Sequence, residues 1–293
     1  MVKTARPCRP PVALPRARRR RGALRLAAVQ AQELQDRIAA FPRWNYSFQL
    51  GEGISTPLPD RGRVNRIEQR RAYFFDRLLE LTGGSLSGRR VLDIGCNAGF
   101  WSLAAVQAGA DFVLGVDFKQ EYVDQASLVF EAKGVAGERY RFEQGDIFEH
   151  PLGERFDIVL CLGVMDHVDR PVELFELMVR AGAQLIVIDT EVSRARASVF
   201  EVSHLYDPRD AAGDGLVLVP SRSAVADLAS RHGLDTVALA LNVSDYLGME
   251  DYRRERRCAF ICSGVHDLSA LPAERRPSLL PWWVRDPRAL AGV

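Results

Sequence analysis

A buried-strand pattern followed by a turn of small residues is the part of this sequence best suited to hold a ligand. The segment VLDIGCNAGFW occupies residues 91–101. Gly95 and Gly99 have no Cβ, so a ligand can approach the backbone where a side chain would collide. The helix expected from Phe100 onward begins here with free backbone N–H groups. We therefore expect a binding site at this turn.

Acidic residues end the strands on either side of this turn. Asp93 ends the first apolar run, and Asp117 ends the next one, 24 residues later. An acid in the second position can accept hydrogen bonds from both hydroxyls of an adenosine ribose. The pair indicates a ligand that contains a nucleoside.

The spacing of the glycines separates two classes of nucleoside ligand. A dinucleotide site carries G-x-G-x-x-G, whereas this chain has D-x-G-x-x-x-G. Asp93 would face a pyrophosphate unfavourably, but it suits the ammonium group of a methionine moiety. A nicotinamide-dependent dehydrogenase is therefore disfavoured.

The D-x-G-x-x-x-G spacing resembles the glycine motif of class I S-adenosylmethionine-dependent methyltransferases, and the resemblance implies that cofactor. Asn97 stands where the family usually has a third glycine, and asparagine tolerates unusual φ values. The family also commonly uses an acid at the position of Asp146 for the adenine amino group, with the next residue packed on the ring. The cofactor-binding residues implied are Asp93, Gly95, Cys96, Asn97, Gly99, Trp101, Asp117, Phe118, Asp146, Ile147 and Leu162.

The run GVMDHVDRP, at residues 163–171, follows the fourth apolar run. Because ligands bind at the carboxyl ends of strands in such sheets, acceptor chemistry is expected here. His167 is the first candidate for a general base that takes the acceptor's proton; it could instead only pack against the loop and the adenine. Asp166 could bind an amine, polarise His167 or be solvated. His204 is the second candidate base.

Three aromatic residues alternate in the N-terminal region. Trp44, Tyr46 and Phe48 suit one face of an extended segment that closes over an apolar or aromatic acceptor, or they serve only to pack a lid. Tyr206 lies with His204 before the last predicted helix, in a region that often lines the pocket. The run YRRERR, at residues 252–257, is interpreted as a solvated hairpin loop.

A narrower resemblance comes from GVMDHVDRP, WNYSFQLGEGISTP and LVLVPSRSAVADLASRHGL, over roughly residues 42–263. These runs resemble the group that includes the bacterial enzymes modifying wobble uridine in tRNA. In those enzymes a tyrosine precedes the loop histidine, where this chain has Asp166, and an acid there would repel the carboxylated cofactor they use. We therefore expect methyl transfer to a small-molecule acceptor in bacterial secondary metabolism. A tRNA-modifying enzyme is the alternative, and a non-catalytic binding protein is a further rival that the intact turn disfavours.

The elements that must position these residues follow from the apolar pattern. Strands are expected at 91–95, 112–117, 140–146, 156–163 and 184–190, and helices at 27–41, 65–81, 100–108, 120–133, 171–181 and 221–232. Alternation of this kind predicts a parallel sheet covered on both faces. Two further runs, at 236–243 and 257–263, predict an antiparallel pair at the sheet edge. The fold class is α/β, a Rossmann-like doubly wound sheet of seven strands with an antiparallel last strand and an N-terminal helical and lid extension.

Charge and composition divide the chain and limit its partners. The expected units are a disordered basic tail (1–25), an N-terminal helical and lid segment (26–84), a cofactor-binding domain (85–265) and a C-terminal tail (266–293). Residues 1–25 hold nine bases and no acid, which leaves 30 bases against 38 acids in the body. That excess disfavours a nucleic-acid partner without excluding one, and no stretch reaches the ~18 apolar residues of a membrane span.

Five scattered cysteines indicate reduced thiols in the cytoplasm and no metal site. A homodimer, and whether O, N or C is methylated, stay open.

Overall fold

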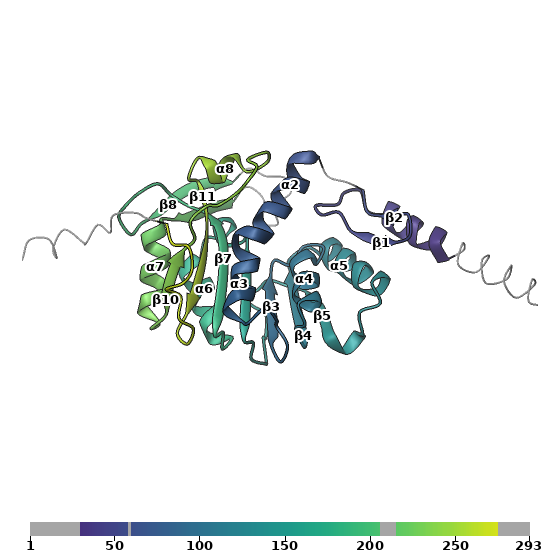
Figure 1. Cartoon of the computed structure of the whole chain (residues 1–293), viewed down its shortest axis with the longest axis horizontal. Coiled ribbons are helices and arrows are strands. Elements are labelled where there is room, and N and C mark those ends of the chain that lie inside the picture. The colour runs from purple at the N-terminus through teal and green to yellow at the C-terminus, as the bar shows by residue number, and fades with distance from the viewer. Residues whose placement is uncertain (1–29, 58–59, 206–214, 275–293) are drawn as a thin grey trace, which may run out of the picture.

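The computed structural model describes residues 30–57, 60–205 and 215–274 (Figure 1). The predicted basic tail, Tyr206 and residues 275–293 lie outside these ranges. A seven-stranded sheet organises the chain in the order β10-β11-β7-β6-β3-β4-β5. Its strands are β3 (Arg90–Ile94), β4 (Phe112–Asp117), β5 (Tyr140–Gln144), β6 (Ile158–Leu162), β7 (Leu185–Glu191), β10 (Asp235–Ala238) and β11 (Arg257–Ser263).

Strands β5, β4, β3, β6 and β7 run parallel, while β11 pairs antiparallel with both β7 and β10. The predicted fold class, with its antiparallel edge, is confirmed. Because the chain order reverses beside β3, the carboxyl ends of β3, β4 and β6 meet where such sheets bind ligands.

Helices cover both faces of the sheet, and alternation along the strands supplies both cores. Val91 packs in one cluster with Phe74 and Phe130, while its neighbour Leu92 packs in the other with Phe175. Successive strand residues point to opposite faces, so a strand buried on both sides is apolar throughout. The covering helices are α4 (Phe100–Gln107), α5 (Gln120–Ala132), α6 (Pro171–Arg180) and α7 (Arg222–Arg231).

The N-terminal segment forms a helix at 30–39, a hairpin of β1 (Gln49–Gly51) and β2 (Ile54–Ser55), and the helices α2 (Arg61–Arg70) and α3 (Asp76–Leu81). Figure 1 shows α2 rising above the upper end of the sheet, where β3 and β7 end. One helix was expected at 65–81; the structure starts it at Arg61, where Asp60 caps it. A π-helical turn (Arg71–Phe75) interrupts it and buries Tyr73, Phe74 and Phe75 in succession.

Several elements were not expected. Strands β8 (Phe200–Leu205) and β9 (Gly215–Pro220) form a separate antiparallel pair. Short helical turns lie at Gly137–Arg139 and Met165–His167, and α8 (Glu250–Arg253) overlaps the run expected to be a solvated hairpin loop. The expected strand at 236–243 is shorter, because β10 ends at Ala238. Among the described residues, no helix combines the length and apolarity needed to cross a bilayer.

Candidate active site

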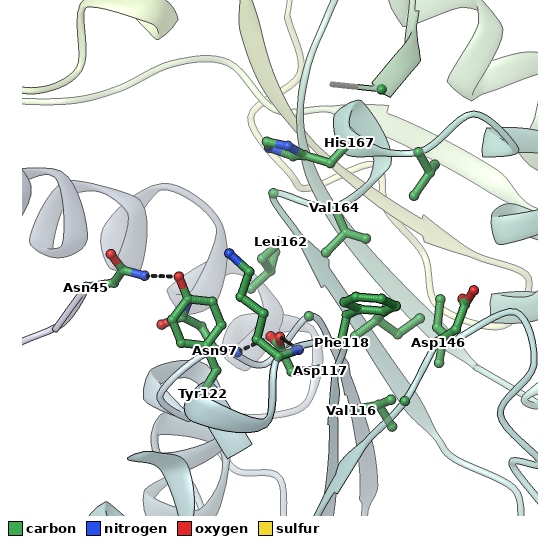
Figure 2. A pocket seen from close by; sticks show the side chains of 18 of the residues that line it. Asn45, Asn97, Val116, Asp117, Phe118, Tyr122, Asp146, Leu162, Val164 and His167 are labelled. Atoms are coloured by element: carbon green, nitrogen blue, oxygen red, sulfur yellow. Dashed lines mark hydrogen bonds between the residues drawn. The ribbon is translucent and has the colours of Figure 1, made fainter. Parts of the chain in front are cut away.

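A cavity of about 930 Å³ opens above the carboxyl ends of β3, β4 and β6 (Figure 2). Gly95, Asn97 and Asp117 line it from the sheet, and residues of α2 line it from the N-terminal segment. Figure 2 shows Val164 and His167 on one side and Asn45 and Tyr122 on the other, with Tyr122 bonded to Asn45 at 3.2 Å. The cavity therefore lies where the sequence predicts binding.

The turn after β3 requires its small residues. Gly95 has φ +67°, and a Cβ there would lie 2.5 Å from Cγ2 of Val164. Asn97 has φ +49°, and its side-chain Oδ1 accepts a hydrogen bond from the Ala98 N–H at 2.8 Å. Asparagine thus adopts the left-handed conformation in place of the family's third glycine, as expected from its tolerance of positive φ.

Asp117 presents a fixed carboxylate to the cavity. One oxygen accepts the N–H of Asn97 at 2.8 Å, and the other accepts the N–H of Lys119 at 3.0 Å. An ionised carboxylate has about four acceptor positions, so it can accept further hydrogen bonds from a ligand. Burial raises the pKa of Asp117.

Asp93 lies behind the turn and does not line the cavity. The Ser102 hydroxyl donates to its carboxylate at 2.6 Å. Burial raises the pKa of Asp93 to about 7; the Ser102 bond opposes this shift and the charge of Asp117 adds to it. A cation bound nearby would favour the ionised form.

Other predicted cofactor residues divide into lining and supporting groups. Phe118, Asp146, Ile147 and Leu162 line the cavity, and Phe118 is 53% exposed. Cys96, Gly99 and Trp101 do not line it. They are packing residues: a Cβ on Gly99 would lie 3.1 Å from Ala126 and 3.3 Å from Phe142, and Cys96 and Trp101 are each 3% exposed.

His167 lines the cavity from the turn that follows β6. Its imidazole is 29% exposed, and Nε2 lies 3.6 Å from Oδ2 of Asp166. The position gives a proton acceptor access to a bound molecule.

Asp166 does not line the cavity, which corrects its prediction as a substrate contact. Its side chain is 1% exposed, and its carboxylate accepts from Arg257 at 2.8 Å and from Thr190 at 3.0 Å. These partners hold the pKa of Asp166 below its usual range despite burial. Asp166 is an internal counter-ion.

The run 252–257 is not wholly a solvated loop, because Tyr252 and Arg257 are buried. Arg257 contacts Asp166, Asp189 and Asp251, and the Tyr252 hydroxyl donates to Asp189 at 2.7 and 2.8 Å. Tyr252 and Arg257 thus form a buried polar cluster with these carboxylates.

The alternating aromatics separate in the structure. Trp44 and Phe48 are buried in the core and do not line the cavity, so packing accounts for them. Tyr46 lines the cavity and stacks on Phe100, with ring centroids 5.0 Å apart at 11°. His204 is exposed on β8, opposite Leu216, and is not among the lining residues.

Sequence reasoning missed the arginines of α2. Arg63, Arg66 and Arg70 line the cavity, and their spacing of three and four places them on one face of the helix. Arg70 is buried, lies 2.5 Å from Asp189, and sits over the rings of Phe74 (5.4 Å) and Trp101 (5.5 Å). Among the described residues, its Nε has no hydrogen-bond partner. The signal was present in the spacing, but the helix was interpreted only from its apolar side.

Within the described ranges, no group of three or more His, Cys, Asp or Glu residues could hold a metal ion. Cys96, Cys161, Cys258 and Cys262 are buried free thiols. Burial raises the pKa of Cys258 and of Cys262 to about 12 each.

Comparison with known sequences gives a family match across the centre of the sheet. A model described as a methyltransferase domain matches residues 91–183. The ubiquinone biosynthesis O-methyltransferase of Bordetella avium (strain 197N) is 39% identical over 103 residues, which are 35% of this chain and 40% of that protein. The protein of the same name from Pseudomonas fluorescens (strain SBW25) is 35% identical over 153 residues, 50% of this chain and 60% of that protein. The chain thus spans less than two thirds of either relative.

Solved structures share the fold over more of the chain. The N-terminal domain of EvdMO1 with SAH bound has a TM-score of 0.61 at 20% identity, covering 79% of this chain and 94% of that one. Magnesium protoporphyrin IX methyltransferase from Synechocystis PCC 6803 with bound SAM has a TM-score of 0.52 at 15% identity, covering 79% and 95%. Residues 91–183 thus match a methyltransferase domain, and the solved structures share the fold of the chain.

Proposed function

We propose that the chain transfers a methyl group from S-adenosylmethionine to a small-molecule acceptor in bacterial secondary metabolism. The observation that carries the proposal is the Asp117 carboxylate, fixed by two backbone N–H groups at the cavity floor beside the Gly95 turn. That arrangement suits the two hydroxyls of a ribose.

The residues present fit the whole cofactor. Asp117 would bind the ribose, and Phe118, Asp146 and Ile147 would surround the adenine. Arg70 would bind the carboxylate of the methionine moiety, since Arg70 lines the cavity and its guanidinium is already held by Asp189. Asp93 would favour the nearby ammonium group. When bound, the cofactor supplies an electrophilic methyl group on a sulfonium.

The chain's own groups then have three tasks: alignment of the acceptor, exclusion of water and removal of the acceptor's proton. His167 is the proposed proton acceptor, because it lines the cavity and a neutral imidazole can take a proton near neutral pH. His204 stays a second candidate; on β8 it lies opposite Leu216, which lines the cavity.

A small-molecule acceptor is favoured over tRNA on two grounds. The relatives with sequence similarity are named for ubiquinone biosynthesis, and the acid excess of the body opposes a polyanion. Asp166 does not separate the two acceptor classes, because it is buried against Arg257 and does not line the cavity.

The two acceptor classes separate in a transfer assay. Purified protein would be incubated with methyl-labelled S-adenosylmethionine and either a bacterial small-metabolite fraction or total bacterial tRNA, with Asp117→Ala as the blank. We expect label in the small-metabolite fraction alone. Label in tRNA that Asp117→Ala abolishes would establish the alternative.

A further inference from the structure

Helix α2 forms a wall of the cavity that the proposed cofactor contacts leave largely unused. Arg63, Arg66 and Ile67 line the cavity one turn or more before Arg70. All four lie on one face of the helix by their spacing. The next question is which acceptor chemistry this wall suits.

The charge of the lining is uneven. Its acids are Asp117, Asp146 and Asp169. The first two are proposed adenosine contacts, and the third is 67% exposed and lies 3.7 Å from Arg170. The α2 wall therefore presents cations to the cavity, whereas the carboxylates that pair with them are not lining residues.

The direction of the helix adds to this positive potential. Helix α2 has ten residues and no acid in its first turn, with Asp60 as its N-cap. Arg63 lies in the first turn, at the positive end of the helix dipole, where anions are stabilised. The Asp60 carboxylate already lies 3.7 Å from Arg63 Nε, and an anion in the cavity beside this end would be stabilised in the same way.

Both guanidinium groups are fixed in place. Arg66 donates to the two carboxylate oxygens of Asp251 at 2.7 Å each and to the carbonyl of Gly248 at 2.8 Å. These bonds use three of its five N–H groups. Arg63 Nη1 donates to Asn45 Oδ1 at 3.1 Å. A guanidinium held in this way loses little freedom when it binds a carboxylate or phosphate.

We propose that the methyl acceptor carries a carboxylate or phosphate group, which Arg63 and Arg66 bind in the cavity that His167 also lines. This inference rests on the proposed function. The helix face, the charge of the lining and the dipole all favour an anion at this wall. The acceptor's reacting atom would then face the cofactor from the α2 side.

The test is binding of matched probes to protein saturated with S-adenosylhomocysteine, measured by titration calorimetry. The probes are para-hydroxybenzoate, phenyl phosphate and the neutral para-hydroxybenzyl alcohol. We expect one or both anions to bind at least about tenfold more tightly than the alcohol, a difference of about 1.4 kcal/mol. Arg63→Gln and Arg66→Gln should each remove that preference. Arg61→Gln should keep it, because Arg61 is exposed on the same helix and does not line the cavity.

Each result has a defined meaning. Preference for the carboxylate or for the phosphate identifies which group the wall accepts. Equal binding of anions and alcohol, no binding of any probe, or an unchanged preference in Arg63→Gln overturns the inference. Circular dichroism checks the fold of each variant. If Arg66→Gln unfolds because Asp251 has lost its partner, the result for Arg63→Gln decides the test. Absence of S-adenosylhomocysteine binding in the unmodified protein contradicts the proposed function instead.

Discussion

The carboxylate of Asp166 lies 2.8 Å from the guanidinium of Arg257, although the next residue, His167, lines the cavity. Two neighbouring residues that could both have contacted substrate therefore have different surroundings. Asp166 anchors the turn to β11, and His167 lines the cavity. The anchor comes from a strand that lies outside the matched methyltransferase domain.

Arg257→Met should destabilise the protein strongly. The substitution leaves Asp166 buried without its main counter-ion, and breaking a buried pair in this way costs about 3–5 kcal/mol. Urea denaturation measures the change in the free energy of unfolding. Arg256→Met is the matched control, because Arg256 is the adjacent exposed arginine, and it should change stability by less than about 0.5 kcal/mol. Equal losses in the two variants would show that the buried pair is not what matters.

Arg70→Gln should weaken binding of S-adenosylhomocysteine without weakening binding of methylthioadenosine, which lacks the amino-acid portion. Loss of a charge-assisted hydrogen bond is worth about 1.5–3 kcal/mol, so the Kd should rise roughly ten- to hundredfold. Calorimetry of both ligands against both proteins gives the comparison.

Arg71→Gln is the control for that experiment, since Arg71 is the next residue, is half exposed and does not line the cavity. It should bind both ligands like the unmodified protein. A parallel loss of both ligands in Arg70→Gln would mean that Arg70 supports the fold and does not bind the carboxylate.

Gly95→Ala should lower cofactor affinity through a collision, beyond the backbone strain that any side chain would bring. Gly95 has φ +67°, and its new Cβ would meet Val164 at 2.5 Å. Gly134 has φ +65° with nothing within 4 Å of a Cβ, so Gly134→Ala carries the strain alone. Gly134→Ala should lose about 1–2 kcal/mol of stability, Gly95→Ala should lose at least as much, and only Gly95→Ala should bind S-adenosylhomocysteine more weakly. Comparable affinity in the two variants would contradict close packing at the turn.

Asp93 should make the ligand-free protein less stable as the pH rises from about 4 to about 7. Its pKa is about 7 in the folded protein, against 3.8 in the reference state. Between these values the folded chain keeps a proton that the unfolded chain has lost, so stability falls with rising pH. Denaturation at pH 5 and pH 8 should show a larger loss for the unmodified protein than for Asp93→Asn, by an amount on the order of 2–4 kcal/mol.

Ligand binding should change the protonation state of Asp93. The ammonium of S-adenosylhomocysteine favours ionised Asp93, so binding at pH 6 should release a proton. Calorimetry in buffers with different heats of ionisation measures the number released. Release that persists in Asp93→Asn would assign the proton to another group.

Local patterns predicted much of the fold and part of the site. The alternation of strands and helices predicted the sheet, and the positions of Gly95 and Asp117 predicted the cavity floor, because these features depend on residues close in sequence. The role of Asp166 could not be predicted in this way. Its partner Arg257 lies 91 residues away, and only the antiparallel placement of β11 beside β7 brings the two together.

The α2 arginines show a second limit. Their spacing is visible in the sequence, but whether that face meets solvent or a cavity depends on how α2 packs over the sheet. The π-helical turn at Arg71–Phe75 also changes the side of the helix on which the following residues lie. Trp44 and Phe48 show the converse, since an extended aromatic pattern serves equally for a lid over substrate and for core packing.

Direct titration of the purified protein with S-adenosylhomocysteine and, in parallel, with NAD tests the central claim. We predict S-adenosylhomocysteine binding in the micromolar range, roughly −8 kcal/mol, no binding of NAD, and loss of the first in Asp117→Ala. Binding of NAD alone, or S-adenosylhomocysteine affinity that survives Asp117→Ala unchanged, would contradict the assignment of the cavity to S-adenosylmethionine.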